Sequence, residues 1–438
     1  MAKKITNKLA HLPQEITIDR MEEHPHTLEL FISFPAPEIR ACPRCGSNDC
    51  VIKDSGRVQT VRHVTCSSTG VLLTFHKRRL KCKDCSSSFY EQPYWLHPSS
   101  RITLALYSDI CRGLMTTHSI RDIALQNGVT ESIVTNVLKS VDFSHPDQLP
   151  HTLCIDEFKG SSGEWEPTKR RWDINKYHCN ISDGDTGCIV DILPAIDLAS
   201  LTEYFYGYSI DVRRRVRFFA CDMHGGFISL AKRCFPNVTV CIDMFHVVRL
   251  LNENVTSIRR ILQNELRDNG DEEAYQLLKK SARLLTTSER NKDRYWGSRY
   301  DVKAERLEQI LALSDDLREA YDALQDFHCI LVEPMYSIQR ADLTDWIRKY
   351  SASENPDTRR CANTIRHHRT YIQNSWKYKK SNATAEGLND RIKVLKRNGY
   401  GAHSFENFRK RILFSCGYTK FVEETYTIAA EKHAGKEA

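Results

Sequence analysis

The sequence contains no uninterrupted apolar run near twenty residues, the length that a membrane-spanning helix requires. It begins MAKKITNKLA, which lacks the apolar segment of a secretory signal peptide. Because the chain is also long, at 438 residues, its sixteen cysteines do not indicate the disulfides of a small secreted domain. We expect a cytosolic protein with reduced thiols and no membrane partner.

Positive charge is clustered rather than spread along the chain. The net charge of +7 is a small excess, but residues 359–411 contain fourteen Lys or Arg against three acids, Glu386, Asp390 and Glu406. A local imbalance of this kind suits a polyanionic partner better than a small molecule. The length allows one large core or several smaller ones, and we expect more than one domain.

Four cysteines form two pairs with the spacing of zinc ligands. The pairs lie in CPRCG and CKDCS and comprise Cys42, Cys45, Cys82 and Cys85. Gly46 and Ser86 follow them as small residues that permit a tight turn, and VLLTFHKRRLKC alternates like a strand that leads into the second pair. We expect four thiolates around one structural Zn²⁺. Buried hydrophobic cysteines are the alternative, and this is our interpretation of the remaining cysteines, including Cys50 and Cys66.

The segment after Pro98 has the pattern of a helix-turn-helix. Apolar residues recur at intervals of three and four, and Ala124, Gly128 and Val134 fall at the small, turn and buried positions of the motif. Thr130 would cap the second helix. That helix would present five polar side chains to a major groove, namely Glu131, Ser132, Thr135, Asn136 and Lys139. An ordinary helical hairpin is the alternative.

Three predicted strands each carry an aspartate to their C-terminal end. HTLCIDEFKG contains Asp156, RVRFFACDM contains Asp222, and NVTVCIDMFHVV contains Asp243. Two further strands, RWDINKYHCNISD and GCIVDILPAI, follow the first, and the helices SLTEYFYGY and GGFISLAKRCF alternate with the later ones. A three-strand meander followed by alternating helices and strands is the ribonuclease H topology. For any single aspartate, an acid that only caps a strand end is the alternative.

The residues between Asp243 and the last basic helix have helical periodicity and few strand signals, which predicts an all-helical insertion. AERLEQILALSDDLREAYDALQDFHCILV is expected to be one amphipathic helix. Its buried side would contain Leu307, Ile310, Leu317, Leu324 and Phe327. Trp346 and Trp376 are either DNA-stacking residues or, as is commoner in helices, core residues.

The chain resembles the DDE transposases of the bacterial ISL-three insertion-sequence family. The resemblance rests on the four-cysteine segment, the helix-turn-helix and the motifs CIDEF, ACDMHGGF, CIDMFHVVRLLN and AEGLNDRIKVLKRNGYGAHSFENFRKRI. It implies that Asp156, Asp222 and Glu386 form the DDE triad. It also implies support from the D-x-x-H stretch, with Asp243 near the metals and His246 orienting a carboxylate or a phosphate. The rival assignment makes Asp243 rather than Asp222 the second metal ligand.

The resemblance also implies the chemistry and the partners. DDE carboxylates hold two Mg²⁺ or Mn²⁺ ions, which activate a nucleophile and stabilise the leaving oxygen of a phosphodiester. Expected partners are duplex DNA with terminal inverted repeats, target DNA and a second copy of the chain on paired ends, in the nucleoid-associated cytoplasm of a bacterium. The helix after Glu386 would face DNA phosphates with Arg391, Lys393, Lys396 and Arg397. One departure from the family pattern is Asp390, where a second asparagine is expected.

The expected fold is an α+β multidomain chain with a zinc-binding N-terminal module, a helix-turn-helix and a ribonuclease H-like core that carries an all-helical insertion. The expected boundaries, in that order with the core in two parts around the insertion, are 1–97, 98–141, 151–250, 251–375 and 376–438. Two other functions are open. A DNA-binding regulator on a degenerate core is disfavoured by the three intact acids, and a resolvase-type nuclease of ribonuclease H-like fold is disfavoured by two N-terminal DNA-reading modules.

Overall fold

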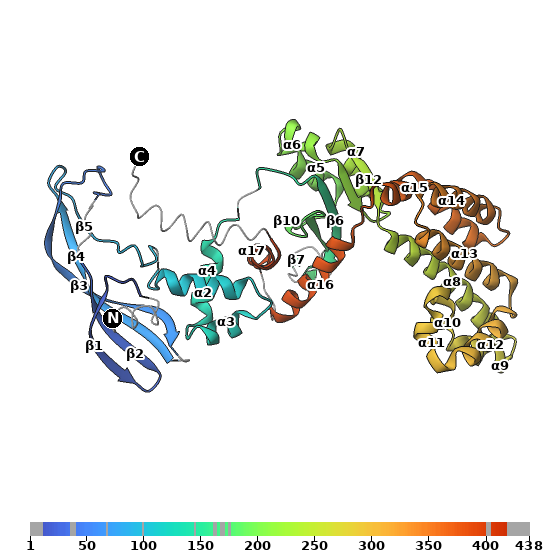
Figure 1. The fold of residues 1–438 in the computed structure, drawn as a ribbon, viewed down its shortest axis with the longest axis horizontal. Coiled ribbons are helices and arrows are strands. Elements are labelled where there is room, and N and C mark those ends of the chain that lie inside the picture. Colours follow the sequence, from blue (N-terminus) through green and yellow to red (C-terminus); the bar gives the residue numbers. More distant parts are fainter. Residues whose placement is uncertain are drawn as a thin grey trace.

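The chain was analysed as a computed structural model, in which the described residues are 12–35, 41–66, 69–98, 100–143, 146–160, 164–166, 171–173, 177–399 and 404–417. Figure 1 shows an elongated molecule, with a β-rich region at one end, a helical region at the other and a mixed sheet between them. Over the described part of the chain, no helix combines the length and the apolar composition needed to cross a membrane.

The N-terminal region is a twisted sheet with the strand order β1-β2-β4-β3, and β5 pairs with the far end of β4. Strands β2 and β4 are parallel and the other pairs are antiparallel. Leu73, Phe75 and Trp95 are buried in its core. The strands are β1 (Thr17–His24), β2 (Thr27–Ser33), β3 (Cys50–Cys66), β4 (Thr69–Cys82) and β5 (Ser88–Tyr90). The predicted strand that leads into Cys82 is therefore confirmed as part of β4.

Three short helices follow the N-terminal sheet. They are α2 (Leu104–Leu114), α3 (Ile120–Gln126) and α4 (Glu131–Ser140). A capping box between Ser119 and Asp122 begins α3, and Gly128 has a φ of +60°, a conformation that favours glycine, in the turn before α4. Thr130 occupies the predicted N-cap position of α4, but its side chain makes no capping hydrogen bond.

The central sheet has the order β10-β9-β6-β11-β12. Neighbouring strands are antiparallel from β10 to β6 and parallel from β6 to β12. The strands are β6 (Thr152–Lys159), β9 (Tyr177–Asp183), β10 (Ile189–Leu193), β11 (Phe218–Cys221) and β12 (Thr239–Ile242). Side chains alternate between the two faces of this sheet, because successive residues of a strand point in opposite directions.

One predicted strand was wrong in its extent. The segment RWDINKYHCNISD contains two strands, because β6 ends at Lys159, whose partner is Tyr177, and pairing with the central sheet ends there. The first part, β8 (Arg171–Asp173), pairs instead with β7 (Glu164–Glu166) in a separate two-stranded ribbon.

Helices cover both faces of the central sheet. Leu153, Phe219 and Val240 point to one face, where they share a core with α5 (Leu198–Tyr206), α7 (Gly225–Cys234) and α8 (Met244–Asp268). A short helix, α6 (Ile210–Arg215), leads into β11.

The opposite face of the central sheet is covered by α16 (Ala383–Asn398). Cys154, Ala220 and Cys241 point to this face, where Ala385 packs on them. Helix α17 (Phe405–Cys416) lies on the same face beside β10. Asp156 shares the α16 face with Cys154, since the two lie two residues apart on β6.

The helical region lies between β12 and α16. It comprises α8 and then α9 (Glu272–Lys279), α10 (Ala282–Thr286), α11 (Lys292–Trp296), α12 (Tyr300–Leu311), α13 (Asp315–Val332), α14 (Tyr336–Ser351) and α15 (Pro356–Tyr378). Short 3₁₀ turns, Glu289–Asn291 and Gly297–Arg299, flank α11. Both α8 and α15 share one continuous hydrophobic core with the central sheet. Helix α8 runs through residue 250 and α15 through residue 375, so the expected limits of the insertion fall within continuous helices.

The expected single amphipathic helix in this region is two helices, so that prediction was wrong. Ser314 accepts a hydrogen bond from the main-chain nitrogen of Leu317, and Asp315 and Asp316 follow in the first turn, which together begin the new helix α13. The five expected core residues are all buried. Trp346 is also buried and donates from Nε1 to the carbonyl of Ala323 at 2.9 Å, so it is a core residue rather than a DNA-stacking one.

Candidate functional site

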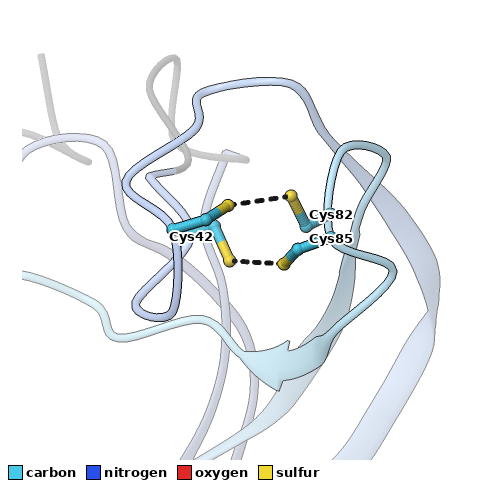
Figure 2. Close-up of side chains that lie close together, drawn as sticks. Cys42, Cys82 and Cys85 are labelled. Carbon is cyan, nitrogen blue, oxygen red and sulfur yellow. Dashed lines mark hydrogen bonds between the residues drawn. The ribbon is translucent and has the colours of Figure 1, made fainter.

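Two turns bring the four predicted zinc ligands together. Figure 2 shows Cys42, Cys82 and Cys85 pointing into one space between the turns. The sulfur atoms of Cys42 and Cys85 are 3.6 Å apart, and those of Cys45 and Cys82 are 3.7 Å apart. Zinc bonded to four sulfur atoms at about 2.3 Å in a tetrahedron requires sulfur–sulfur distances of about 3.8 Å. The four thiols therefore fit a structural Zn²⁺ ion.

The two turns have the same backbone design. Gly46 and Ser86 both have positive φ values, of 74° and 59°, at equivalent positions after the second cysteine of each pair. Ser87 places its Oγ 3.2 Å from Cys42 Sγ and 2.9 Å from Cys85 Sγ. This hydrogen bonding lowers the pKa of the Cys42 thiol to about 6 and also lowers the pKa of Cys85. Lowered thiol pKa values favour the thiolates that bind metal at these two positions. The hydrogen bond from the backbone of Ser47 lowers the pKa of Cys45, but hydrogen bonding to the neighbouring thiols and burial outweigh it, so that this pKa is raised instead.

The three predicted aspartates lie at neighbouring positions along the central sheet. Asp156 is near the end of β6, Asp222 directly follows β11 and Asp243 directly follows β12. Because these strands are parallel, their C-terminal ends meet at one edge of the sheet. Asp156 and Asp243 are 8% and 4% exposed, whereas Asp222 is half-buried.

Helix α16 brings Glu386 to this edge and fixes Asp156. Asn389, one turn after Glu386, donates from Nδ2 to Asp156 Oδ2 at 2.7 Å. The Oδ1 atom of Asn389 accepts a hydrogen bond from Asn180 Nδ2 at 3.1 Å. Residues three apart lie on the same side of a helix, so Glu386 faces the same region as Asn389.

Asp243 is committed to the protein backbone through both carboxylate oxygens. Oδ1 accepts from the nitrogen of Phe245 at 2.9 Å and caps α8, and Oδ2 accepts from the nitrogen of Asn382 at 2.9 Å, just before α16. Asp222 has one such bond, from the nitrogen of His224 to Oδ1 at 2.9 Å. Asp222 is therefore the more available of the two for an external ligand.

Glu386 lies near several acidic side chains and one histidine. His246 Nε2 lies 3.5 Å from Glu386 Oε1. Burial raises the pKa of Glu386, and the charges of Asp243 and Asp156 raise it further, while His246 opposes them. Burial likewise raises the pKa of Asp156, with a smaller contribution from Asp222. Converging carboxylates with raised pKa values form a site that a hard cation would stabilise.

The carboxylates do not converge as tightly as the cysteines. Among the described residues, ligand atoms that all lie within 4.8 Å of one another occur in the four-cysteine set and in Glu22, His24 and Glu29. The side chains of the second set lie on the β1–β2 hairpin and are exposed or half-buried. Glu22 already pairs with Arg20 at 2.9 Å. Asp156, Asp222 and Glu386 belong to neither set.

Comparisons with known proteins identify the family of the chain. A family of DDE transposases, the ISL3 group, described as "Transposase", matches residues 153–412, which is more than half of the chain and includes Asp156, Asp222, Asp243 and Glu386. The chain belongs to the ISL3 family of DDE transposases. A second family, described as the zinc-finger of transposase IS204/IS1001/IS1096/IS1165, matches residues 39–85 and includes all four cysteines.

Individual relatives support the family assignment. The transposase for insertion sequence element IS1001 of Bordetella parapertussis is 23% identical to this transposase over 396 residues, which cover 89% of this chain and 92% of the relative. A protein named ATP-dependent protease, from Lactococcus lactis subsp. lactis, is 33% identical over 111 residues, 25% of this chain and 34% of that protein. The second match is too short to carry an argument about function.

In this transposase, the predicted DNA-facing lysines and arginines of α16 divide into two groups. Arg391 donates to the carbonyl of Met115 at 3.2 Å, and Lys396 donates to the carbonyls of Lys159 and Gly160 at 3.1 and 2.6 Å. Lys393 is exposed and pairs at 2.8 Å with Asp390, the acid that departs from the family pattern. Arg397 is exposed. The sequence did not predict that Arg391 and Lys396 donate hydrogen bonds to main-chain carbonyls.

The predicted DNA-reading residues of α4 are exposed or half-buried. Asn136 lines a groove of about 710 Å³ between α4 and the N-terminal sheet. Arg62 and Arg101 line the same groove, and both are exposed. The nitrogen of Arg62 donates to the carbonyl of Arg101 at 3.0 Å, so β3 directly pairs with the segment that enters α2. Sequence reasoning missed both arginines, because neither lies in a basic run near α4.

Asn180 and Asn389 were also missed as site residues. Their side chains are buried, and a buried amide requires partners for its donors and its acceptor. The signal available in the sequence was the spacing of Asn389 from Glu386, which puts both on one side of α16. Asn180 gave no comparable signal, since its position opposite Asp156 depends on the pairing of β6 with β9.

Proposed function

We propose that this transposase binds the ends of its insertion sequence and catalyses metal-dependent DNA cleavage and strand transfer, with Asp156, Asp222 and Glu386 as the catalytic carboxylates. The observation that carries the proposal is the packing of α16 on β6, where Asn389 contacts Asp156 and Glu386 lies one turn away. The strand order β10-β9-β6-β11-β12, antiparallel on one side and parallel on the other, supports a ribonuclease H-like core.

The carboxylate set suits hard divalent cations, since all its donor atoms are oxygen. Asp156, Asp222 and Glu386 would hold them. Two bound Mg²⁺ or Mn²⁺ ions would activate the attacking water or 3′-hydroxyl and stabilise the leaving oxygen of the phosphodiester. The raised pKa values of Asp156 and Glu386 support this assignment, because converging negative charge is what a cation would neutralise.

Asp243 and His246 have supporting roles in this proposal. Asp243 joins the start of α8 to the residue before α16, so it positions Glu386 rather than binding metal. His246, at 3.5 Å from Glu386, would orient that carboxylate or a DNA phosphate. Asp243 accepts two main-chain hydrogen bonds and Asp222 accepts one, which supports Asp222, rather than Asp243, as the second metal ligand.

The DNA-binding part of the proposal assigns helices α2, α3 and α4 to a helix-turn-helix. The residues offered to the major groove are Glu131, Ser132, Thr135, Asn136 and Lys139. Lys393 and Arg397 are phosphate contacts of α16, and Arg62 and Arg101 are phosphate contacts of the groove beside Asn136.

The proposed partners are terminal inverted repeats, target DNA and a second copy of the chain in a homodimer on paired ends. The proposed domain boundaries are the five ranges expected from the sequence, and the last one extends into residues 418–438, outside the described part of the chain.

The test is a paired assay on labelled end DNA, in which gel shift reports binding and nicking reports catalysis. Glu386→Gln keeps size and hydrogen-bonding capacity but removes the charge that holds metal, so nicking should fall by several orders of magnitude while binding persists. Asp156→Asn and Asp222→Asn should behave in the same way. Glu406→Gln, an exposed glutamate on α17, is the matched control and should nick normally. Normal nicking by Glu386→Gln would contradict the proposal and favour a DNA-binding regulator.

A further inference from the structure

Five consecutive main-chain carbonyls between α2 and α3 are all bonded by side chains from α16 and α17. The acceptors are the oxygens of Leu114, Met115, Thr116, Thr117 and His118. The donors are Arg391, Asn398 and Arg411, from a part of the chain about 280 to 300 residues away. We call these three residues the carbonyl clamp.

Arg411 makes most of the carbonyl clamp. Its Nη1 donates to the carbonyl of Leu114, and its Nη2 donates to those of Thr116 at 2.9 Å and His118 at 2.7 Å. Arg391 Nη2 bonds Met115 at 3.2 Å, and Asn398 Nδ2 bonds Thr117 at 2.7 Å. A helix C-terminus carries partial negative charge on carbonyls that lack helical partners, so a cation at the end of α2 is well placed.

The Arg411 side chain is buried, with 8% of the residue exposed. Burial lowers its pKa to about 10, so the guanidinium remains charged at neutral pH. A buried charge without partners is strongly unfavourable. The buried guanidinium therefore favours the geometry in which the α2–α3 connection lies against α17 and supplies its acceptors.

The end of α4 is held by the same helix. Lys410 Nζ donates to the carbonyls of Lys139 at 2.9 Å and Val141 at 2.8 Å. The rings of Phe143 and Phe414 pack edge to face with centroids 5.0 Å apart. Figure 1 shows α17 between α2–α4 and the central sheet, with α16 reaching from the sheet toward α3. Both ends of the α3–α4 pair are thus attached to the two helices that follow the candidate active site.

Helix α16 connects the clamp directly to the catalytic region. Arg391 lies five residues after Glu386 on this helix, a distance of about 7.5 Å along the axis at 1.5 Å per residue. A continuous helix does not change length, so a shift of the α2–α3 connection would move α16 and the Glu386 carboxylate with it.

We propose that the carbonyl clamp sets the distance between the DNA sequence that α4 reads and the phosphodiester that Glu386 attacks, with Arg411 as its main positioning residue. The inference rests on the proposed function. It adds that hydrogen bonds within the chain, formed before DNA binds, determine which phosphodiester is cut. Helix α4 and the Glu386 carboxylate would then belong to one rigid unit rather than being joined by a flexible linker.

The first experiment maps nicks on labelled end DNA at nucleotide resolution. Arg411→Met keeps the length of the buried side chain but removes its three hydrogen bonds. Because misplacing a reacting group by about 1 Å can cost about a hundredfold in rate, kcat at the wild-type position should fall about a hundredfold. New nicks should appear at neighbouring phosphodiesters, while KM for end DNA stays unchanged. Arg348→Met, which removes the same charge from an exposed position on α14 with no assigned role in binding or catalysis, should nick as the wild type does.

A second variant covers the case in which Arg411→Met does not fold. Arg391→Ala/Asn398→Ala removes two clamp bonds from partly exposed residues and should shift nicks in the same way with a smaller loss of rate. A folded Arg411→Met protein with wild-type nick position and kcat would overturn the proposal. An equal shift from Arg348→Met would also overturn it, since loss of charge alone would then suffice.

Hydrogen exchange separates failure of this inference from failure of the proposed function. In DNA-free protein, the amides of α2–α4 and α16–α17 should be protected to the same extent, and Arg411→Met should expose α2–α4 selectively. This outcome supports the rigid link even if the wild type does not nick DNA, in which case only the proposed function fails. Unequal protection in the wild type would refute the rigid link whatever the nicking assay shows.

Discussion

Asn389 donates from Nδ2 to Asp156 Oδ2 at 2.7 Å, across 233 residues of sequence. Asn180 donates in turn to Asn389 Oδ1 at 3.1 Å, so the amide of Asn389 is held with its donor toward the carboxylate. The main-chain nitrogen of Glu157 donates to the other oxygen of Asp156 at 2.8 Å. Asp156 thus has its orientation fixed by a strand neighbour and by α16, before any ligand arrives.

Asn389→Leu should move the acid side of the pH–rate profile for nicking to higher pH. The proposed active form of Asp156 is ionised, and burial already raises its pKa. A hydrogen bond to the charged form favours that form, so loss of the Asn389 donor should raise the pKa further. Nicking would therefore begin at a higher pH than in the wild type, measured at saturating end DNA. Asn264→Leu, an exposed position on α8, should leave the profile unchanged.

The zinc centre should be required for folding of the N-terminal region. Purified protein should contain about one zinc ion per chain, measured by atomic emission, because binding energy at such a site is also folding energy. Cys82→Ser should lose the metal and the N-terminal sheet, since Cys82 ends β4 and its thiol is fully buried. Cys66→Ser is the control and should keep both. Cys66 ends β3 away from the four ligands and is exposed, so the expectation that it is a buried cysteine was wrong, whereas Cys50 is buried as expected. Zinc-free protein with an intact N-terminal sheet would exclude the site.

Local patterns in the sequence were sufficient for the zinc ligands and for the three strands that carry the aspartates. The expected end of the first strand at Asp156 was wrong, because β6 stays paired with β9 as far as Lys159. The C-x-x-C spacing and the alternation of β4 are properties of adjacent residues, and so is the apolar run before each acid. The break between α12 and α13 also has a local cause at Ser314. The apolar periodicity continues through Ser314, and this periodicity alone predicts one helix.

The partners of the basic C-terminal residues could not be predicted in the same way. Arg391 and Arg411 bond main-chain carbonyls, and every residue has a carbonyl, so no side-chain pattern marks the acceptor. A row of lysines and arginines therefore looks the same whether it faces phosphates or the end of a helix. Asn180 was missed for a different reason, because its position opposite Asp156 is set by the pairing of β6 with β9 rather than by adjacent residues.

Asp222→Asn and Asp243→Asn should have different effects on stability. Asp243 accepts two main-chain hydrogen bonds that an amide cannot both replace, so Asp243→Asn should lower the free energy of unfolding by about 1 to 2 kcal/mol. Asp222→Asn should change it little, since Asp222 is half-buried and accepts one such bond. Urea unfolding measures the difference, and nicking assays on the same samples should show the larger loss for Asp222→Asn. The reverse order of stability effects would favour Asp243 as the metal ligand.

Glu386 should make the metal-free protein less stable as the pH rises. Burial raises its pKa first, and the charges of Asp243, Asp156 and Asp390 add to this against the single opposing charge of His246. A carboxyl whose pKa is raised on folding holds its proton more tightly in the folded state than in the unfolded state. Its contribution to stability is therefore complete below the ordinary glutamate pKa and is lost as the pH rises through the folded value.

Glu386→Gln removes this pH-dependent penalty, because its amide does not ionise. In the presence of a chelator, the variant should melt at a higher temperature than the wild type at about pH 8. The difference should disappear at about pH 3, well below the ordinary glutamate pKa, where residue 386 is uncharged in both proteins. Adding Mg²⁺ or Mn²⁺ should stabilise the wild type and leave the variant nearly unchanged, since a ligand that binds only the folded state raises its melting temperature. Glu406→Gln, which changes an exposed acid paired with Arg409, should show neither effect. A wild type that gains no stability from either cation, and differs from Glu386→Gln by the same amount at both pH values, would remove Glu386 from the proposed metal site.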